Sequence, residues 1–454
     1  MLVINKRLFL WLIKAYIKKW GRILALSFLG GLIGFFFLIF FSSYLVHLFP
    51  QKERVGMVGA YSLDKLPDRI TQKLSRGLTK LSPSGEIKPD LAESWQIRDS
   101  GKTYVFKIKR GIRFSNGTEV TSKTLGYVFK DVKIERPDKY TIIFHLHDEY
   151  APFLVTISRP IFPRGLQGLG EYTITDIKIN GDFISSLTLS HTADKHQVVY
   201  VFYPNQEALK TAFLLGEATE IDDIINTKAN NTDIATHKNV AVSRQTNYDQ
   251  LVTLFYNTKD QVISDNKLRK ALSYSLPDSF SQGERAHLPY PPRSIYFSKE
   301  AAVRSQDLAH AKLLLDAVYL NASESARPEL IITTLTKYHV VAASIAKIWE
   351  GLGVKVKITD VDVKPTVFQV YLGDFTVPKD PDQYMLWHSD QESNITKFRS
   401  LRIDKLLEDG RKTVAVKERK RIYDDFQKYL LDDAVIDTPA SFLYFPYTYT
   451  LKRR

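Results

Sequence analysis

Cysteine is absent from all 454 residues of the chain. Its absence excludes disulfide bonds, thiolate nucleophiles and thiolate metal ligands. It also excludes a lipid-modified cysteine at the cleavage site of an export signal. It says nothing about the redox compartment in which the chain folds.

Short catalytic motifs are absent as well. The sequence has neither a His-Glu-x-x-His zinc motif nor a Gly-x-Ser-x-Gly nucleophile elbow. Gly101-Lys102-Thr103 looks like the end of a phosphate-binding loop, but Gln96 stands where that loop requires its first glycine. His145 and His147 share one face of an expected strand without an evident third metal ligand, which favours a solvated strand face. We therefore expect a protein that is not an enzyme and has no metal and no cofactor.

Charged residues are absent from one long stretch, Ile23 to Phe49. The stretch exceeds the ~20 apolar residues that cross a bilayer. It is apolar on every side, so it has no stripe that faces water. A deeply buried core helix is the alternative interpretation, but such helices rarely run so far without a charge. The sequence therefore predicts a transmembrane helix over residues 23–49.

The flanks of this stretch predict its orientation. Six basic residues and no acidic residue precede it: Lys6, Arg7, Lys14, Lys18, Lys19 and Arg22. Because positive charge is retained in the cytoplasm, we expect the N-terminus inside and the chain after Pro50 outside. A cleaved signal peptide is the alternative, but its apolar region is usually ~7–15 residues long and ends at a small-x-small site, which is missing here. We predict an uncleaved, single-pass signal anchor in the cytoplasmic membrane.

Residues 1–22 show an amphipathic pattern ahead of the anchor. Basic residues share one side of a helical wheel and apolar or aromatic residues fall opposite: Arg7, Lys14 and Lys18 against Phe9, Ile13, Tyr16 and Trp20. Such a helix would lie on the anionic inner leaflet. A basic tail that only sets the topology explains the pattern equally well, and both interpretations stay open.

The net charge of +13 raises the question of nucleic-acid binding. Six of these charges precede the anchor, and the others are spread along the exported part without a dense Lys/Arg run. We therefore expect no nucleic-acid partner. The roughly 400 residues after the anchor are too many for one core, so two or more lobes are expected.

Apolar periodicity predicts the main elements of the exported part. Strands are expected at residues 104–109, 141–147, 172–179, 198–202, 254–258, 330–335, 354–361 and 438–445. Helices are expected at 308–318, 339–352 and 417–431 and in the segment 207–222, where the helix ends at Gly216. The strand, helix and strand between residues 330 and 361 predict a parallel pair with a right-handed crossover.

One run of the exported part resembles a known family. It reads Pro89-x-Leu91-Ala92-Glu93-Ser94-Trp95, then Gly101-Lys-Thr-Tyr104-x-Phe106, then Arg110-Gly-Ile-Arg-Phe114 and Gly117. Its order and spacing are similar to those of the family 5 extracellular solute-binding proteins, the oligopeptide- and dipeptide-binding proteins of ABC importers. Later blocks follow the same order, so the resemblance runs from about residue 55 to residue 450. Ser-Asn-Gly at the end of the first run is a mild departure from the family's Asp-Gly.

The resemblance implies an α/β, two-lobed periplasmic-binding-protein type II fold with a hinge, preceded by the N-terminal helix. We expect lobe I with a reduced accessory domain at residues 50–258, lobe II at 259–436 and a C-terminal return to lobe I at 437–454. The implied function is that of a membrane-tethered monomer that captures di- or oligopeptides between its lobes. It would deliver them to an ABC permease and its ATPase subunits.

Two alternatives stay open. The same fold could serve as a tethered sensor or scaffold, and the same scaffold carries metal chelates, haem and sugars in other family members.

The resemblance also implies candidate ligand-binding residues. In peptide-binding relatives an Asp of the second lobe, just before an acidic-Pro step, pairs with the α-amino group of the ligand. Asp380 lies in that step and Asp374 lies six residues earlier, with an insertion-like segment between them, so the two are alternatives. A turn-forming role is the alternative for Asp380. The other candidates are Asn394 of a Ser-Asn step and three aromatics that could equally belong to the core: Tyr371, Tyr384 and Trp387.

Overall fold

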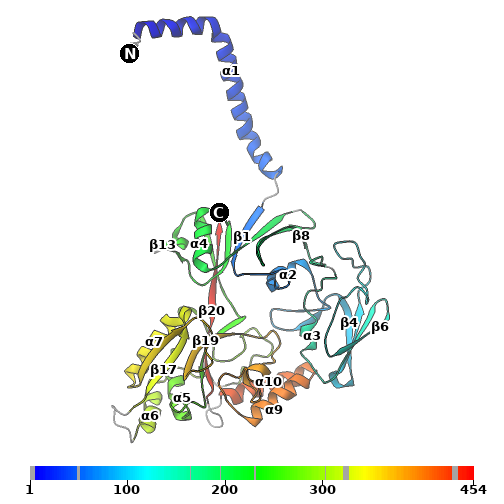
Figure 1. Ribbon diagram of the computed structural model, residues 1–454, viewed down its shortest axis with the longest axis vertical. Helices are drawn as coiled ribbons and strands as arrows, with labels where there is room; N and C mark the ends of the chain where they lie inside the picture. The colour runs from blue at the N-terminus through cyan, green and yellow to red at the C-terminus, as the bar shows by residue number, and fades with distance from the viewer. Residues whose placement is uncertain are drawn as a thin grey trace.

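The computed structural model describes residues 6–48, 52–163, 165–194, 196–229, 232–301, 303–320, 327–431 and 438–454. A long N-terminal helix projects from a body with three parts (Figure 1). We call these parts the first lobe (residues 52–75, 170–246 and 447–454), the accessory domain (76–169) and the second lobe (250–446).

The N-terminal helix α1 (Lys6–Leu48) is bent. Its segments Lys14–Ile23 and Ala25–Phe41 meet at an angle of 51°. Among the described residues no single helix is long and apolar enough to cross a membrane, whereas this bent pair meets both criteria together by length and composition. The predicted single spanning helix over residues 23–49 is therefore not supported in that form, and its last residue, Phe49, lies outside the described residues.

The first lobe is a mixed sheet with the order β8-β9-β10-β1-β11, which continues into β20. Its strands are β1 (Lys52–Val58), β8 (Tyr172–Asn180), β9 (Phe183–His191), β10 (Gln197–Tyr203), β11 (Glu220–Ile224) and β14 (Val240–Thr246), with the small pair β12 (Lys228–Ala229) and β13 (Thr232–Asp233). Its helices are α2 (Asp68–Leu74) and α4 (Gln206–Leu215). The predicted end of the helix at Gly216 is confirmed, since Gly216 adopts a φ of 84° and caps α4, after which the chain forms β11.

The second lobe has helices on both faces of its sheet. The strand order is β18-β17-β19-β15-β20, with β15 (Gln250–Tyr256), β16 (Gly283–Arg285), β17 (Glu329–Leu335), β18 (Lys355–Val361), β19 (Val370–Thr376) and β20 (Ala440–Arg453). One face packs on α5 (Asn266–Tyr274), α6 (Leu308–Val318) and α7 (His339–Gly351). The other packs on α8 (Tyr384–Trp387), α9 (Leu401–Lys412) and α10 (Val416–Leu431). The predicted parallel pair around helix 339–352 is confirmed by the register of β17 and β18.

The accessory domain is a four-stranded sheet with the order β4-β5-β7-β6. Its elements are β2 (Thr79–Leu81), β3 (Ile87–Pro89), β4 (Ala92–Arg98), β5 (Thr103–Ile108), β6 (Val132–Asp138), β7 (Thr141–Leu146) and α3 (Phe153–Thr156). The family-like run supplies its core, since Leu91, Tyr104, Phe106 and Phe114 are all buried. The run therefore specifies the fold of this domain and contributes core packing.

Strand β20 belongs to both lobes (Figure 1). Its first half pairs with β15 and β16 in the second lobe, and its second half pairs with β11 and β14 in the first. The second passage between the lobes lies between β14 and β15, where the N–H of Asn247 donates to the carbonyl of Pro446 at 2.8 Å. These two passages form the hinge. The boundaries predicted after residues 258 and 436 stay predictions.

Contacts away from the hinge also join the parts. The accessory domain meets α9 through the N–H of Ala151, which donates to the carbonyl of Arg411 at 2.7 Å. Lys379 of the second lobe forms an ion pair with Asp68 at the start of α2. The second lobe therefore contacts the rest of the body at the hinge and also through these two pairs of residues.

Candidate functional site

Parallel strands of both lobes point their carboxyl ends at the region where the lobes join. β20 runs from the second lobe into the first, and β11 is antiparallel to it, so β1, β10 and β11 run toward the second lobe. β15 is antiparallel to β20 and β19 is antiparallel to β15, so β17, β18 and β19 run toward the first lobe. Ligands of open α/β sheets bind outside the carboxyl ends of the strands. The candidate site therefore lies between these two sets of strand ends.

Asp374 lies near the carboxyl end of β19 in this region. Its side chain keeps 12% of its surface exposed, and Lys337 approaches Oδ1 to 3.1 Å from the segment that follows β17. Burial, with the negative charge of Asp374, raises the pKa of Tyr338 and of Tyr444 well above the ordinary phenol value. The same causes raise the pKa of Tyr371 to about 12. One carboxylate thus acts electrostatically on three protonated phenols.

Gly373 makes this arrangement possible. A Cβ at position 373 would lie 2.3 Å from the ring of Tyr371. The ring occupies the space that any other residue would fill with its side chain. Gly373 thereby brings the Tyr371 phenol next to the strand position that carries Asp374.

The first lobe contributes a second charged group that sequence reasoning missed. Asp222 and Asp223 lie at the carboxyl end of β11, and Arg69 of α2 pairs with them at 3.0 and 2.8 Å. Burial raises the pKa of Asp223, Arg69 opposes this shift, and the nearby carboxylates of Asp222 and Asp249 add to it. Three carboxylates beside one arginine leave an excess of negative charge, which suits a cationic ligand group. No strand is predicted at residues 220–224, so the sequence gives no sign that these two carboxylates lie at a strand end.

Asp380 has a structural partner of its own. Its two carboxylate oxygens accept hydrogen bonds from Arg419 of α10 at 2.8 and 2.5 Å, and both side chains are almost fully buried. The next acid of the step, Asp382, binds Arg411 of α9 at 2.8 Å. The Asp-Pro-Asp step therefore connects the segment after β19 with α9 and α10 inside the second lobe. The geometry favours Asp374 over Asp380 as a carboxylate for a ligand.

Three of the other candidates have roles inside the second lobe. Tyr371 stacks on Phe255 with ring centroids 6.0 Å apart. Trp387 is fully buried and donates from Nε1 to Gln383 at 2.8 Å. Asn394 is 2% exposed and donates to three backbone carbonyls.

Tyr384 is partly exposed, as Asp374 is. It stacks on His388 at 4.1 Å, and the guanidinium of Arg411 lies 4.2 Å from its ring centroid. Its contacts connect it to α9 and to the Asp-Pro-Asp step.

The two histidines of the accessory domain have acidic neighbours. His145 lies 3.4 Å from Glu135, and His147 lies 3.0 Å from Asp148. Within the described part of the chain, no group of three or more His, Asp or Glu side chains is placed to hold a metal ion.

Curated relatives of the chain are binding proteins. The probable D,D-dipeptide-binding periplasmic protein DdpA of Escherichia coli is 23% identical over 77% of this chain and 78% of its own length. The oligopeptide-binding protein AppA of Bacillus subtilis is 23% identical over 85% of this chain and 83% of its own length.

Solved structures share the fold. The ABC transporter substrate-binding protein CtaP of Listeria monocytogenes superposes with a TM-score of 0.72 at 19% identity, over 89% of this chain and 94% of that chain. NikZ of Campylobacter jejuni in complex with Ni(L-His) gives 0.69 at 17% identity, over 89% and 94%. AppA of Bacillus subtilis in complex with a nonapeptide gives 0.65 at 18% identity, over 89% and 95%. The predicted two-lobed α/β fold is confirmed.

The family model described as bacterial extracellular solute-binding proteins, family 5 (middle), matches residues 86–183 and 190–397, which is more than half of the chain. The chain therefore belongs to the family 5 extracellular solute-binding proteins, the binding components of ABC importers.

Proposed function

We propose that the chain captures peptides with a free α-amino group between its lobes and delivers them to the permease of an ABC importer. Relatives named for dipeptides and oligopeptides support this proposal. An extended peptide suits such a site because strand ends can bind its backbone regardless of sequence, while wet pockets take its side chains.

The observation that carries the proposal is the environment of Asp374. Its carboxylate lies at the carboxyl end of β19, partly exposed, with Lys337 as its ion-pair partner at 3.1 Å. An incoming ammonium group would replace the Lys337 ammonium and keep the carboxylate neutralised. The phenol of Tyr338 would donate to a remaining acceptor site. A hydrogen bond between two charged groups is worth ~1.5–3 kcal/mol, which corresponds to about tenfold or more in affinity.

Calorimetry on the detergent-solubilised full chain tests this proposal with a pool of short peptides. Asp374→Asn should weaken binding about tenfold or more, and N-acetylated peptides should bind the native chain equally poorly. Lys337→Gln should tighten binding, because the amine then meets no competing cation. Asp390→Asn, at an exposed position of the same lobe, is the matched control. Equal affinities of the Asp374→Asn and Asp390→Asn variants would remove Asp374 from the site.

We further propose that α1 tethers the chain to the cytoplasmic membrane with the body outside. Two segments of α1 support this arrangement: the basic segment Lys14–Ile23 and the uncharged segment Ala25–Phe41. Together they have the length and composition of a membrane span. Tethering confines diffusion to the membrane plane and raises the effective concentration at the permease.

Protease treatment of intact cells tests the tether. The body should be digested, while a fragment that contains α1 stays with the membrane after carbonate extraction. A mature chain that begins near residue 45 and is found in the medium would contradict the tether, and it would leave the peptide-binding proposal untouched.

A further inference from the structure

The first lobe has one end from which α1 departs, and the second lobe lies at the opposite end of the body (Figure 1). We call the former the proximal end and define it by the ends of four strands and the last turn of α4: residues 52–54, 214–220, 238–240 and 452–454. β1, β11 and β14 begin there and β20 ends there, because Glu220 pairs with Lys452 and Val240 pairs with Arg453.

The connection between α1 and the proximal end is short. The uncharged stretch of the sequence runs to Phe49, α1 ends at Leu48, and β1 begins at Lys52. Four steps along a chain span at most ~14 Å. A membrane that holds α1, as proposed above, therefore has its surface close to the proximal end. The inference drawn below rests on that proposed tether.

Basic side chains predominate at the proximal end, with six of them against three acidic ones. Two of the acids, Glu53 and Glu220, bind the ammonium of Lys452, and Glu220 does so at 2.9 Å. Four exposed basic side chains of this end have no ion-pair partner within the described part of the chain: Lys52, Arg54, Lys238 and Arg454. Charges attract one another over about a Debye length, ~8 Å at physiological salt, so these four can attract anionic lipid headgroups near the start of β1.

Two exposed leucines lie beside these charges. Leu214 and Leu215 end α4 and are 38% and 72% exposed. Arg453 places this turn at the end of β20, since its guanidinium donates to the carbonyl of Leu214 at 2.9 Å. Aliphatic side chains with basic neighbours suit the interface of an anionic membrane, because the aliphatic groups enter the boundary between headgroups and acyl chains while the cations bind phosphates.

We propose that the proximal end docks on the anionic surface of the membrane that holds α1. Leu214 and Leu215 would enter the headgroup layer, and the four exposed basic side chains would bind lipid phosphates. A lipid surface is favoured over a protein partner because the short connection brings the membrane to this end. Docking would fix the first lobe and leave the second lobe, at the far end of the body, free to move at the hinge.

A spin label tests the docking, because a chain without cysteine can be labelled at one chosen position. The full chain with Leu215→Cys is labelled and reconstituted at one copy per nanodisc, so that no second copy can cover the label. In phosphatidylglycerol discs this label should collide with a water-soluble nickel complex about threefold less often, or rarer still, than a label at Asp64→Cys. In phosphatidylcholine discs, or in about 1 M NaCl, the two labels should agree within about twofold.

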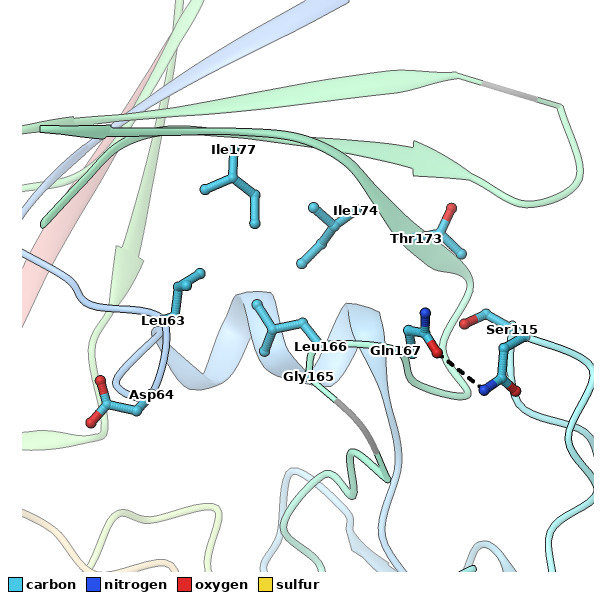
Figure 2. Close-up of a pocket in the computed structure, with 10 residues that line it drawn as sticks. Leu63, Asp64, Ser115, Gly165, Leu166, Gln167, Thr173, Ile174 and Ile177 are labelled. Carbon is cyan, nitrogen blue, oxygen red and sulfur yellow. Dashed lines mark hydrogen bonds between the residues drawn. The ribbon is translucent and has the colours of Figure 1, made fainter.

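Asp64 is a suitable control because it belongs to the same lobe and is exposed. It lies in the loop that follows the other end of β1, beside a cavity of about 750 Å³ between the first lobe and the accessory domain. Its side chain points away from the aliphatic lining of that cavity (Figure 2). A label at this position therefore reports water at a part of the lobe that is remote from α1.

Charge reversal gives an independent readout. Changing all four exposed basic side chains of the proximal end to Glu in the Leu215→Cys chain should raise nickel collision to the control value. Reversing four exposed lysines of the second lobe should leave it low: Lys259→Glu, Lys267→Glu, Lys347→Glu and Lys357→Glu. Leu214→Glu keeps every basic residue and should reproduce the gain if the fourfold variant disturbs folding. All these variants should stay with the discs, since α1 is unchanged.

The outcomes separate the docking from the tether. Equal nickel collision of the Leu215 and Asp64 labels in phosphatidylglycerol discs would overturn the docking and leave the tether in place. A Leu215 label that stays shielded in phosphatidylcholine discs and after charge reversal would overturn an anionic surface as the partner. A chain that does not stay with the discs would overturn the tether and the docking together. Peptide binding is tested separately by the calorimetry on Asp374→Asn.

Discussion

Replacing Asp380 by Asn should destabilise the second lobe far more than it affects ligand binding. The change leaves the guanidinium of Arg419 without its counter-charge in a site where the two side chains keep only 4% and 8% of their surface exposed. Burial alone would lower the pKa of Arg419, but the carboxylate of Asp380 raises it above the ordinary value, so the guanidinium stays charged. Removing one partner of a buried ion pair costs ~3–5 kcal/mol. For a lobe of this size that loss corresponds to a fall in Tm of roughly 6–20 °C.

Guanidinium chloride unfolding followed by tryptophan fluorescence is the measurement, since Trp349 and Trp387 are both buried in the second lobe. Asp425→Asn, at an exposed position of the helix that carries Arg419, is the matched control and should change the free energy of unfolding by less than about 0.5 kcal/mol. The double variant Asp380→Leu/Arg419→Met should recover most of the loss, because it removes both charges. A loss below about 1 kcal/mol for Asp380→Asn would refute the assignment of Asp380 to a structural ion pair.

Two other positions give sharp expectations. Gly373→Ala would place a Cβ 2.3 Å from the ring of Tyr371, so urea unfolding should show a free energy of unfolding lower by ~1–3 kcal/mol. Gly351→Ala is the control, because no atom lies within 4 Å of the new Cβ. It should be neutral or stabilise the chain by up to about 1 kcal/mol. Burial, together with the charge of Arg285, lowers the pKa of His287 to about 4, below the value of ~6.5 in the unfolded chain. The unfolded chain then binds more protons between these values, so the free energy of unfolding should fall as the pH drops from about 6.5 to 4, by an amount that solvent screening of the partly exposed ring reduces. His287→Gln should remove this slope, and an unchanged slope would contradict the assignment.

Local sequence patterns predicted much of the fold, because neighbouring residues largely decide whether a segment forms a helix or a strand. The segment from Glu329 to Val361 forms strand, helix and strand as its apolar periodicity indicates, and Gly353 lies after α7 with a φ of 88°. The final strand is longer than predicted, since β20 extends to Arg453. Its second half alternates tyrosine or leucine with threonine or lysine from residue 447 to 452, a strand pattern that the prediction over 438–445 left out, and it pairs with β11 and β14.

The partners of the candidate site residues were harder to predict, because they are set by tertiary contacts. Asp380 and Arg419 stand 39 positions apart, and no local motif connects them. One signal was present: Arg419 shares its helix face with Tyr423, Phe426 and Leu430, all buried. A charged residue in an apolar stripe requires a buried partner of opposite charge. That reasoning predicts a buried acidic partner for Arg419, but it does not choose between Asp374 and Asp380, because tertiary contacts decide which of them it is.

Strand β20 also has a consequence for the way the chain is made. Asp222 of the first lobe and Thr450 of β20 form a hydrogen bond across 228 positions of sequence. Contacts of such separation form slowly, and a partly made chain exposes the edge of β11 until its last strand arrives. Both lobes therefore reach their final state only when the last strand is in place, although each has a core of its own. An unfinished chain therefore carries an open sheet edge at which it can pair with another unfinished chain until its C-terminus has been made.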